Sequence, residues 1–487
     1  MYSLSQHVNV NKIFLVQFSE LEKRLDPLYY YEILNNKVNF NCASSPFSKI
    51  AKTYSGGTPS KDKPEYWNGN ILWASPKDMK NFYLSDTEDK ITELGLKNSA
   101  TILAPKGSLL IVFRSGILQH TLPVAITEKD TAINQDLKVV IPVNEIIPEF
   151  LAVYFRVFQN RILPRIVKHS TTVQSINQEE LNSLPIPIPD KQTQKQIIAI
   201  NQEAIEHKNQ SEAAAEKLLS SIDDYLLREL GINMPSKNTV NEPVGWKGFK
   251  LNKHNPLVKS GRLFLAAARE IENRIDPEYY RLFYCVLFDE IKNVSHCRLK
   301  DVTQLIDYGL MPTQDYAKDE NSGIPFIRVT NILASGEIDM SNTKYIPFDT
   351  PRVDQKRVKE NDILMVQCGS TTGKVAVVPK EYENYLANSF SFIIRSNEKI
   401  RQDFLFYILS SPIVQMQIVR SQNIVTVRPN TSKPAVENLL IPLPPLEKQI
   451  EIAQHISEIR QQAQLLQKEA TQALQQAKEK IEKMILG

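Results

Sequence analysis

Two long segments carry the helical pattern most clearly. Residues 191–229 and 446–486 contain neither Gly nor Pro. In the second segment, apolar and small residues recur at alternating steps of four and three, which is the heptad seam of a coiled coil. These seam residues are Ile452, Ile456, Ile459, Ala463, Leu466, Ala470, Ala473 and Ala477. In the first segment, the expected seam consists of Ile198, Ile205, Leu219, Ile222 and Leu226. Because neither seam is expected to face water, we predict that the two helices, each on the order of 60 Å long, pair with each other.

Short apolar runs between the helical segments predict β-strands. Gly, Pro, Asn and Ser interrupt these runs, as expected where strands end in turns. The predicted strands span residues 108–113, 137–141, 363–366, 375–378 and 391–394. Strands in the middle and helices at the ends predict a mixed α/β (α+β) fold.

The chain contains the same pattern twice. Residues 14–30 (FLVQFSELEKRLDPLYY) and 264–280 (FLAAAREIENRIDPEYY) share nine of 17 positions at an offset of 250. Residues 186–189 (IPIP) and 441–444 (IPLP) each precede one of the long helical segments. A repeat of this length indicates duplicated domains rather than a solenoid. We therefore expect two similar units related by an internal pseudo-two-fold repeat.

The repeat divides the chain into six predicted segments. They are an N-terminal helical segment (1–40), a first α/β domain (41–187), a central long helix (188–235), a linker with the start of the second repeat (236–295), a second α/β domain (296–442) and a C-terminal long helix (443–487). We expect the two α/β domains to be separated by the two long helices, running antiparallel as a coiled coil.

Composition fits a globular chain with a sizeable core. Of the 487 residues, 42% are hydrophobic and 23% are charged, and the net charge of +3 excludes a chain that is basic throughout. Residues 1–6 lack the basic start of a signal peptide, and no uncharged apolar run reaches the length of a transmembrane helix. We expect a cytoplasmic protein without a membrane partner.

Acidic residues are missing from four stretches of the predicted domains. These stretches are 94–127, 150–178, 363–380 and 404–436, and each contains Lys or Arg. Arg and Lys neutralise phosphates, and Arg, Asn and Gln hydrogen-bond to base edges. Solvated loops with incidental charge are the alternative. Because such stretches occur in both copies, the pattern favours a nucleic-acid partner.

Catalytic motifs are incomplete. Residues 369–374 (GSTTGK) have one residue too few between the glycines for a phosphate-binding loop, and no Ser or Thr follows the Lys. Residues 26–29 (DPLY) lack the second proline of an adenine methyltransferase motif. Asp190, Glu206 and Lys208 fit a metal-nuclease pattern only superficially, because they lie on or beside a predicted helix. We predict no catalytic residue, metal ligand or bound cofactor. A self-contained DNA methyltransferase, a nuclease and a coiled-coil scaffold remain alternatives.

Several motifs resemble the DNA-specificity subunit of type I restriction–modification systems. Residues 56–60 (GGTPS), 64–67 (PEYW) and 73–78 (WASPKD) look like the opening of its target-recognition domains. Further similar segments are 114–116 (RSG), 122–125 (LPVA), 133–136 (INQD), 171–176 (TTVQSI) and 441–446 (IPLPPL) with Gln449. The first copy departs at Asp190 and Lys191, which replace a Pro-Leu pair, and the second copy has residues 309–313 (GLMPT) where Gly-x-Thr-Pro is expected.

The resemblance implies a non-catalytic subunit that reads double-stranded DNA. Each α/β domain would be a target-recognition domain that contacts one half of a bipartite, asymmetric sequence. The paired helices would act as a spacer and dock two methyltransferase subunits. Those subunits would supply S-adenosylmethionine, and restriction/motor subunits in the assembled complex would use ATP and Mg²⁺.

We expect the DNA contacts to come from the acid-free loops and their flanks. In the first domain the candidates are Lys61, Lys77, Arg114, Gln119, His120, Thr172 and Gln174. In the second domain they are Arg328, Asn331, Gln367, Ser370, Thr371, Lys374, Arg428 and Lys433.

Overall fold

The structure is a computed structural model that describes residues 15–16, 21, 30, 39–143, 145–168, 173–235, 279, 282–422 and 429–486. The chain divides into two compact units. The first comprises residues 1–213 and 466–487, and the second comprises residues 214–465. Most of the repeated opening segments, 14–30 and 264–280, lie outside the described residues.

The first unit is built on two β-sheets. The larger has the strand order β2-β10-β7-β8-β4, in which only the β8–β4 pair is parallel, and the smaller has the order β5-β3-β9-β6. The strands of the larger sheet are β2 (Ala51–Ser55), β4 (Tyr83–Leu84), β7 (Leu109–Val112), β8 (Val124–Thr127) and β10 (Leu137–Pro142). Those of the smaller sheet are β3 (Trp67–Ala74), β5 (Asp89–Ile91), β6 (Ile102–Ala104) and β9 (Thr131–Ile133).

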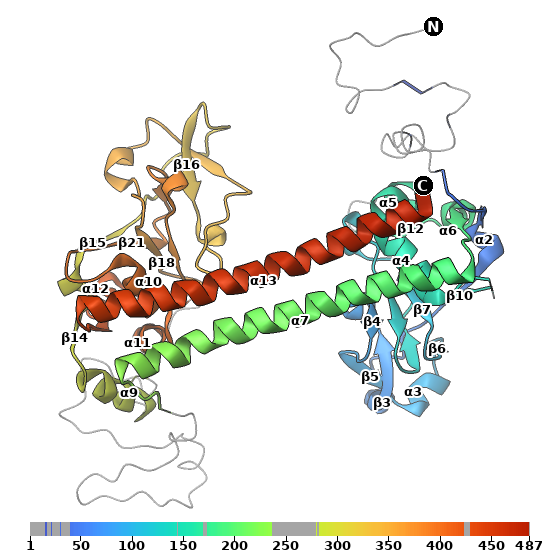
Figure 1. Cartoon of the computed structure of the whole chain (residues 1–487), viewed down its shortest axis with the longest axis horizontal. Coiled ribbons are helices and arrows are strands. Elements are labelled where there is room, and N and C mark those ends of the chain that lie inside the picture. Colours follow the sequence, from blue (N-terminus) through green and yellow to red (C-terminus); the bar gives the residue numbers. More distant parts are fainter. Residues whose placement is uncertain are drawn as a thin grey trace, which may run out of the picture. The chain divides into compact units, whose positions relative to one another are not determined.

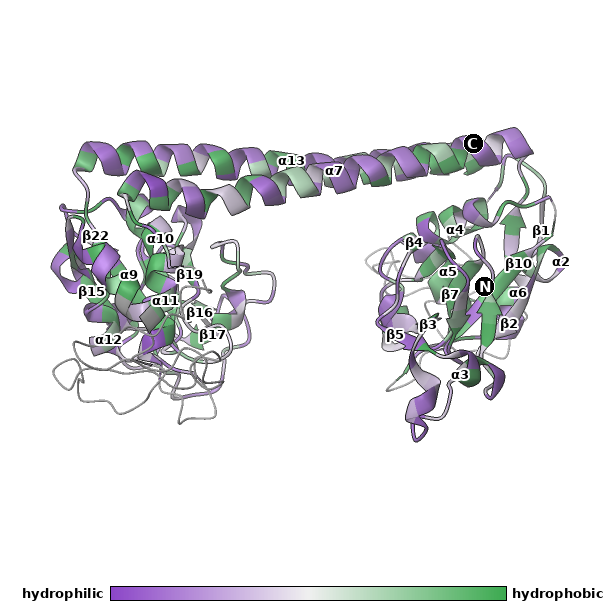
Figure 2. Cartoon of the chain, turned by 90° about the horizontal axis from the view of Figure 1, so that it is seen from below, coloured by the Kyte–Doolittle hydropathy of each residue, from purple (hydrophilic) through white to green (hydrophobic). Residues whose placement is uncertain are grey.

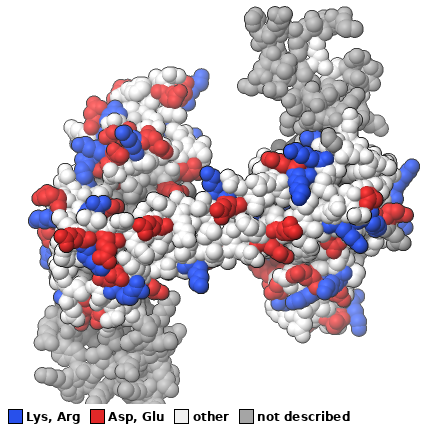
Figure 3. Space-filling model, in the orientation of Figure 1, with Lys and Arg blue, Asp and Glu red and all other residues white. Residues whose placement is uncertain are grey.

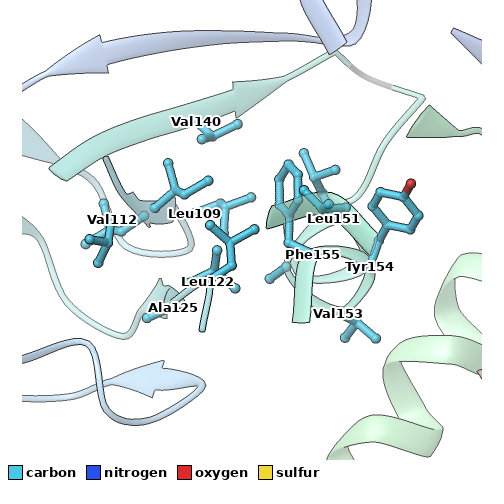
Figure 4. Packing of buried hydrophobic residues seen from close by; sticks show 14 of the residues in the cluster. Leu109, Val112, Leu122, Ala125, Val140, Leu151, Val153, Tyr154 and Phe155 are labelled. Carbon is cyan, nitrogen blue, oxygen red and sulfur yellow. The ribbon is translucent and has the colours of Figure 1, made fainter. Parts of the chain in front are cut away.

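Helix α4 (Pro148–Val157) packs against the larger sheet and closes the core of the first unit. Pro148 occupies the first turn of α4, where its missing N–H costs no hydrogen bond. All four residues of β7 are buried, as in a strand covered on both faces. Figure 4 shows Leu151 and Phe155 of α4 with Leu109 of β7 and Val140 of β10 in this core. Helices α2 (Phe47–Ile50), α3 (Glu93–Lys97), α5 (Gln159–Ile166) and α6 (Gln178–Ser183) complete the domain.

The second unit repeats this architecture. Its four-stranded sheet has the order β15-β21-β18-β19, and a three-stranded sheet has the order β17-β16-β20. The strands are β15 (Thr303–Tyr308), β16 (Gly323–Ile327), β17 (Lys344–Pro347), β18 (Ile363–Val366), β19 (Val375–Val377), β20 (Leu386–Ala387) and β21 (Ser391–Ser396). The helices of the domain are α9 (Leu282–Lys292), α10 (Gln402–Ser410), α11 (Pro412–Ser421) and α12 (Lys433–Glu437).

Strand registers confirm the internal repeat. In the first unit Leu137 pairs with Val112, and in the second Ser391 pairs with Val366 at the equivalent positions of β21 and β18. A two-stranded sheet joins the ends of each domain: β1 (Ser44–Pro46) pairs with β13 (Pro185–Pro187), and β14 (His296–Arg298) pairs with β22 (Leu440–Pro442). The five strands predicted from apolar runs correspond to β7, β10, β18, β19 and β21, and the apolar runs do not predict the other strands.

Both long helices exist over the predicted residues. They are α7 (Lys191–Leu230) and α13 (Leu446–Leu486), and Figure 1 shows them lying side by side. Ile197 near the start of α7 shares a core with Ile481 and Ile485 near the end of α13. Leu226 near the end of α7 shares the other core with Ile452 near the start of α13. The helices therefore pack together in an antiparallel pair.

The expected seam is right for α13 and partly wrong for α7. All eight predicted seam residues of α13 are buried or half-buried, but Leu219 of α7 is 39% exposed. The fully covered positions of α7 include Ile197, Ala204, Ser211 and Ala215. Small side chains line this seam, and they let two helices approach more closely than a leucine would. Figure 2 shows polar residues along the rest of both helices. Within the described part of the chain, no helix is long and apolar enough to cross a membrane.

Candidate nucleic-acid interface

Four loops of the first domain meet through backbone hydrogen bonds. The Gly57 N–H donates to the Ile133 carbonyl oxygen at 3.0 Å, which joins the loop after β2 to the end of β9. The Phe113 N–H donates to Asp136 O at 2.7 Å, and the Ser115 N–H donates to Gln174 O at 3.0 Å. Residues 56–60, 113–119, 134–136 and 173–176 therefore form one group, which we call the first loop group.

The second domain assembles the same loops by equivalent bonds. The Leu310 N–H donates to Ala387 O at 2.7 Å, and the Gln367 N–H donates to Phe390 O at 2.8 Å. The Gly369 N–H donates to Pro429 O at 3.0 Å. Residues 309–313, 367–373, 388–390 and 429–431 form the second loop group. Each of the four acid-free stretches supplies one loop to these two groups.

Gly56 and Gly309 are the equivalent points at which two loops touch. A Cβ atom on Gly56 would lie 2.1 Å from Ile133 O, and a Cβ atom on Gly309 would lie 2.2 Å from Ala387 O. Neither distance leaves room for a side chain. The close contact of the two loops therefore requires glycine at these positions. This explains why the GGTPS and GLMPT segments both begin with Gly.

An ion pair marks the centre of the first loop group. The Arg114 Nε atom lies 2.8 Å from Asp136 Oδ1, and the Arg114 side chain remains 60% exposed. Lys138 lies beside it, with its Nζ atom 3.8 Å from the centre of the Phe113 ring. Burial lowers the pKa of Lys138. The Arg114 guanidinium keeps unused donors on the exposed side, as a contact to a base edge or a phosphate requires.

The other candidates of the first domain differ in accessibility. Lys61, Gln119 and His120 are exposed; Gln119 ends the short helix Gly116–Gln119, which lies in the first loop group, and His120 follows it. Lys77 is exposed but pairs with Asp89 at 2.9 Å and Glu88 at 3.2 Å, and the hydrogen bond to Asp89 raises its pKa. Gln174 is only 7% exposed. Thr172 lies outside the described residues.

Asn331 and Arg328 stabilise a turn in the second domain. Asn331 is 4% exposed; its Oδ1 accepts from the Arg328 N–H at 2.8 Å, and its Nδ2 donates to Asp339 O at 2.7 Å. Arg328 Nη2 donates to Asn342 O at 2.8 Å. Its buried Nε has no hydrogen-bond partner among the described residues. These contacts commit Asn331 to the fold and use part of the Arg328 guanidinium.

The remaining candidates surround the second loop group. Ser370 is exposed, and Gln367 and Thr371 are half-buried on the same loop. Lys374 Nζ lies 3.4 Å from Ile332 O, and Lys433 Nζ lies 3.9 Å from Glu437. Arg428 lies outside the described residues. On the face that Figure 3 shows, Lys and Arg are intermixed with Asp and Glu on each unit.

Equivalent positions of the two loop groups carry different chemistry. In the first group Thr58 hydrogen-bonds to Gln135, next to the Arg114–Asp136 pair. In the second group Met311 replaces Thr58, Ser389 replaces Gln135, Cys368 replaces Arg114 and Phe390 replaces Asp136. Met311 and Phe390 are 59% and 44% exposed. The sequence pattern does not single out either side chain, because apolar residues in a strand-rich segment are ordinarily core.

The chain thus contains a duplicated α/β domain, with one loop group in each copy, and a pair of long helices. Residues 45–218 and 291–476 both match the family described as the type I restriction modification DNA specificity domain, and the chain belongs to this family. It is therefore a recognition subunit of a type I restriction–modification complex rather than a catalytic one.

Relatives agree with this assignment. The EcoR124I/EcoR124II specificity subunit of Escherichia coli is 40% identical over 153 residues, which cover 31% of this chain and 38% of that protein. The MjaIX specificity subunit of Methanocaldococcus jannaschii is 25% identical over 409 residues, which cover 81% of each chain. A solved structure from work on the assembly and conformational transition of a type I system is 15% identical, with a TM-score of 0.52 over 92% of this chain and 97% of that one. This last similarity shows the fold alone.

Proposed function

We propose that the two loop groups read the two halves of a bipartite, asymmetric DNA sequence. The observation that carries the proposal is that one backbone framework presents different side chains in the two domains. Thr58 and Asp136 stand near Arg114 in the first domain, whereas the exposed apolar side chains of Met311 and Phe390 occupy the equivalent positions in the second. Because the two loop groups share a backbone arrangement but differ in side chains, they suit two half-sites of different base sequence.

In the first domain, we assign base or phosphate contacts to Arg114 and Gln119 of the first loop group, to His120 directly after it and to Lys61 on the adjoining loop. In the second, we assign them to Gln367, Ser370 and Thr371, with Lys374 and Lys433 at the margin. Thr172 and Arg428 stay predictions from sequence. Gln174 and Asn331 are buried in the fold, and Lys77 is paired with Glu88 and Asp89.

The antiparallel helices α7 and α13 are the proposed docking surface for two methyltransferase subunits. Those subunits would bring S-adenosylmethionine, and restriction/motor subunits joining the complex would bring ATP and Mg²⁺. The complex would act on DNA in the cytoplasm. The purified chain alone should neither methylate nor cut DNA, and adding methyltransferase subunits should restore methylation. Methyl transfer by the lone chain would contradict the division of labour.

The decisive experiment maps methylated adenines across the genome in cells with and without this chain. A single bipartite sequence should lose its methylation when the chain is absent. Replacing residues 41–187 by the corresponding domain of another specificity subunit should change one half of that sequence only. A protein-only scaffold predicts no salt-dependent DNA binding by the assembled complex, which is the opposite outcome.

A further inference from the structure

Met311 and Phe390 lie on adjoining loops of the second loop group. The Ser389 hydroxyl, one residue before Phe390, donates to Met311 Sδ at 3.2 Å. The Leu310 N–H donates to Ala387 O, and the Ser389 N–H donates to Leu310 O at 2.9 Å, so the two loops are held together by the backbone on both sides of the contact. We call Met311 and Phe390 the apolar pair.

Single exposed apolar side chains are common on protein surfaces and need no explanation by themselves. The apolar pair differs because both members occupy equivalents of polar residues in the first domain, where Thr58 and Asp136 stand. Both are exposed, at 59% and 44%, in a loop group whose Ser370 is also exposed. The substitution therefore replaces hydrogen-bonding groups by apolar surface inside the candidate interface.

The backbone keeps the pair in place. The Phe390 N–H donates to Asn388 Oδ1 at 2.7 Å, and the Ser391 N–H donates to Asn388 O at 2.9 Å. A Cβ atom on Gly309 would lie 2.2 Å from Ala387 O, so the backbones of the two loops are in close contact there. Apolar side chains held on such short loops suit a small, fixed apolar target.

Thymine offers that target. In the major groove, its C5-methyl group is the apolar feature that distinguishes it from the other bases. We propose that Met311 and Phe390 contact thymine C5-methyl groups in the half-site read by the second domain. This inference rests on the proposed DNA-reading function and specifies its chemistry at one place.

The test uses the complex with methyltransferase subunits and duplexes that carry its mapped target sequence. Each thymine of the second half-site is replaced in turn by deoxyuridine, which pairs like thymine but lacks the methyl group. At one thymine or more, the dissociation constant should rise about fourfold, the effect expected for removing one methyl group from an apolar contact. Deoxyuridine in the first half-site provides the internal control.

Variants then link the effect to the pair. Met311→Thr and Phe390→Asp, which install the residues of the first domain, should each abolish or reduce the difference between thymine and deoxyuridine. Met311→Leu keeps an apolar side chain and should preserve the difference. All three variants should keep the wild-type response in the first half-site.

Three results would overturn the inference: a second half-site without thymine, equal binding of every thymine and deoxyuridine duplex, or variants that weaken both duplexes equally. The last result would indicate a wedge between base pairs instead. Each of these results leaves sequence-specific binding intact. Failure of the proposed function would instead appear as a complex that binds no bipartite sequence at all.

Discussion

Gln194 and Gln449 make the same set of hydrogen bonds in the two halves of the molecule. The side-chain oxygen of Gln194 accepts from the Ile147 N–H at 2.8 Å, and that of Gln449 accepts from the Arg401 N–H at 2.9 Å. Each amide nitrogen donates to the proline carbonyl that lies five residues earlier, at 2.9 Å. A second bond from that nitrogen reaches Glu145 O at 2.7 Å or Lys399 O at 3.4 Å.

These bonds fasten the first turn of each long helix to the start of α4 or α10. Gln194 and Gln449 are 0% and 1% exposed, so the lost bonds cannot be replaced by water. Gln194→Leu and Gln449→Leu should each lower the free energy of unfolding by about 2–4 kcal/mol, because buried backbone groups lose their partners. Thermal or urea unfolding measures the effect. Gln196→Leu, at an exposed position of the same helix, is the control and should change the free energy of unfolding little. If Gln194→Leu and Gln449→Leu were both as stable as wild type, these hydrogen bonds would not stabilise the fold.

Asp190 caps α7 and should make the stability of the first unit depend on pH. Its carboxylate accepts from the Thr193 N–H at 2.9 Å and the Thr193 hydroxyl at 2.7 Å. The hydrogen bond from the Thr193 hydroxyl contributes most to lowering the pKa of Asp190. Because the pKa is lower in the folded state, the ionised carboxylate stabilises the fold at pH values above the ordinary pKa. This stabilisation is lost as the pH falls through the lowered pKa. Asp190→Asn should therefore have a lower melting temperature than wild type at neutral pH, and this difference should shrink in acid. A difference that grows in acid would contradict this sign.

Asp362 and Arg395 form a buried ion pair between the loop before β18 and β21. The Asp362 side chain is 1% exposed, and the Arg395 Nε and Nη2 atoms each lie 2.7 Å from one of its oxygens. Arg395→Met should destabilise the second unit by about 3–5 kcal/mol, because it leaves a carboxylate buried without its cation. The double variant Asp362→Leu/Arg395→Met should recover much of this loss in denaturant unfolding. A double variant that is less stable than Arg395→Met would show that the pair itself stabilises the fold.

Arg114 tests the first loop group. If Arg114 reads a base, Arg114→Ala should relax one position of the first half-site and cost about 1–3 kcal/mol of binding. If it contacts a phosphate, affinity should fall uniformly and the salt dependence should decrease by about one counterion. Asp136→Asn removes the paired carboxylate and should strengthen the salt dependence instead. Arg114→Ala and Arg428→Ala that both leave affinity and specificity unchanged would refute the assignment.

The length of helix α7 should set the number of base pairs between the two half-sites. Inserting four residues after Ala213 adds close to one turn, about 6 Å, to the continuous helix. Because DNA rises about 3.4 Å per base pair, the non-specific gap in the methylated sequence should lengthen by about two base pairs. Methylome sequencing measures both the gap and the half-sites. New half-site bases with an unchanged gap would contradict this relation.

The sequence predicted whole elements better than single side chains. The strands at 363–366 and 137–141 and both long helices follow from apolar runs and from the absence of Gly and Pro, which act locally. Asp190 departs from the motif that the second copy keeps, and the structure explains the departure as a helix cap. Sequence alone could not give this reason, because capping depends on how the chain enters the helix.

Polar residues in loops were harder to interpret. Asn331 and Gln174 have side chains suited to DNA, but the fold buries them. Asn commonly closes turns through its own amide, and that competing use has no separate signature in sequence. Heptad spacing predicts Leu219 on the α7 seam, but Ser211 and Ala215 are the buried residues there, because close packing favours small side chains.

The discontinuous first unit has a consequence for synthesis. The Asn41 N–H donates to Ile485 O at 2.9 Å, and Ile481 and Ile485 belong to the same core as Phe155. A ribosome translates all of residues 214–465 before it adds these isoleucines. The nascent first domain must therefore wait with part of its apolar surface uncovered, while the second can fold as a contiguous segment. Such long sequence separation slows folding and exposes the waiting domain to aggregation.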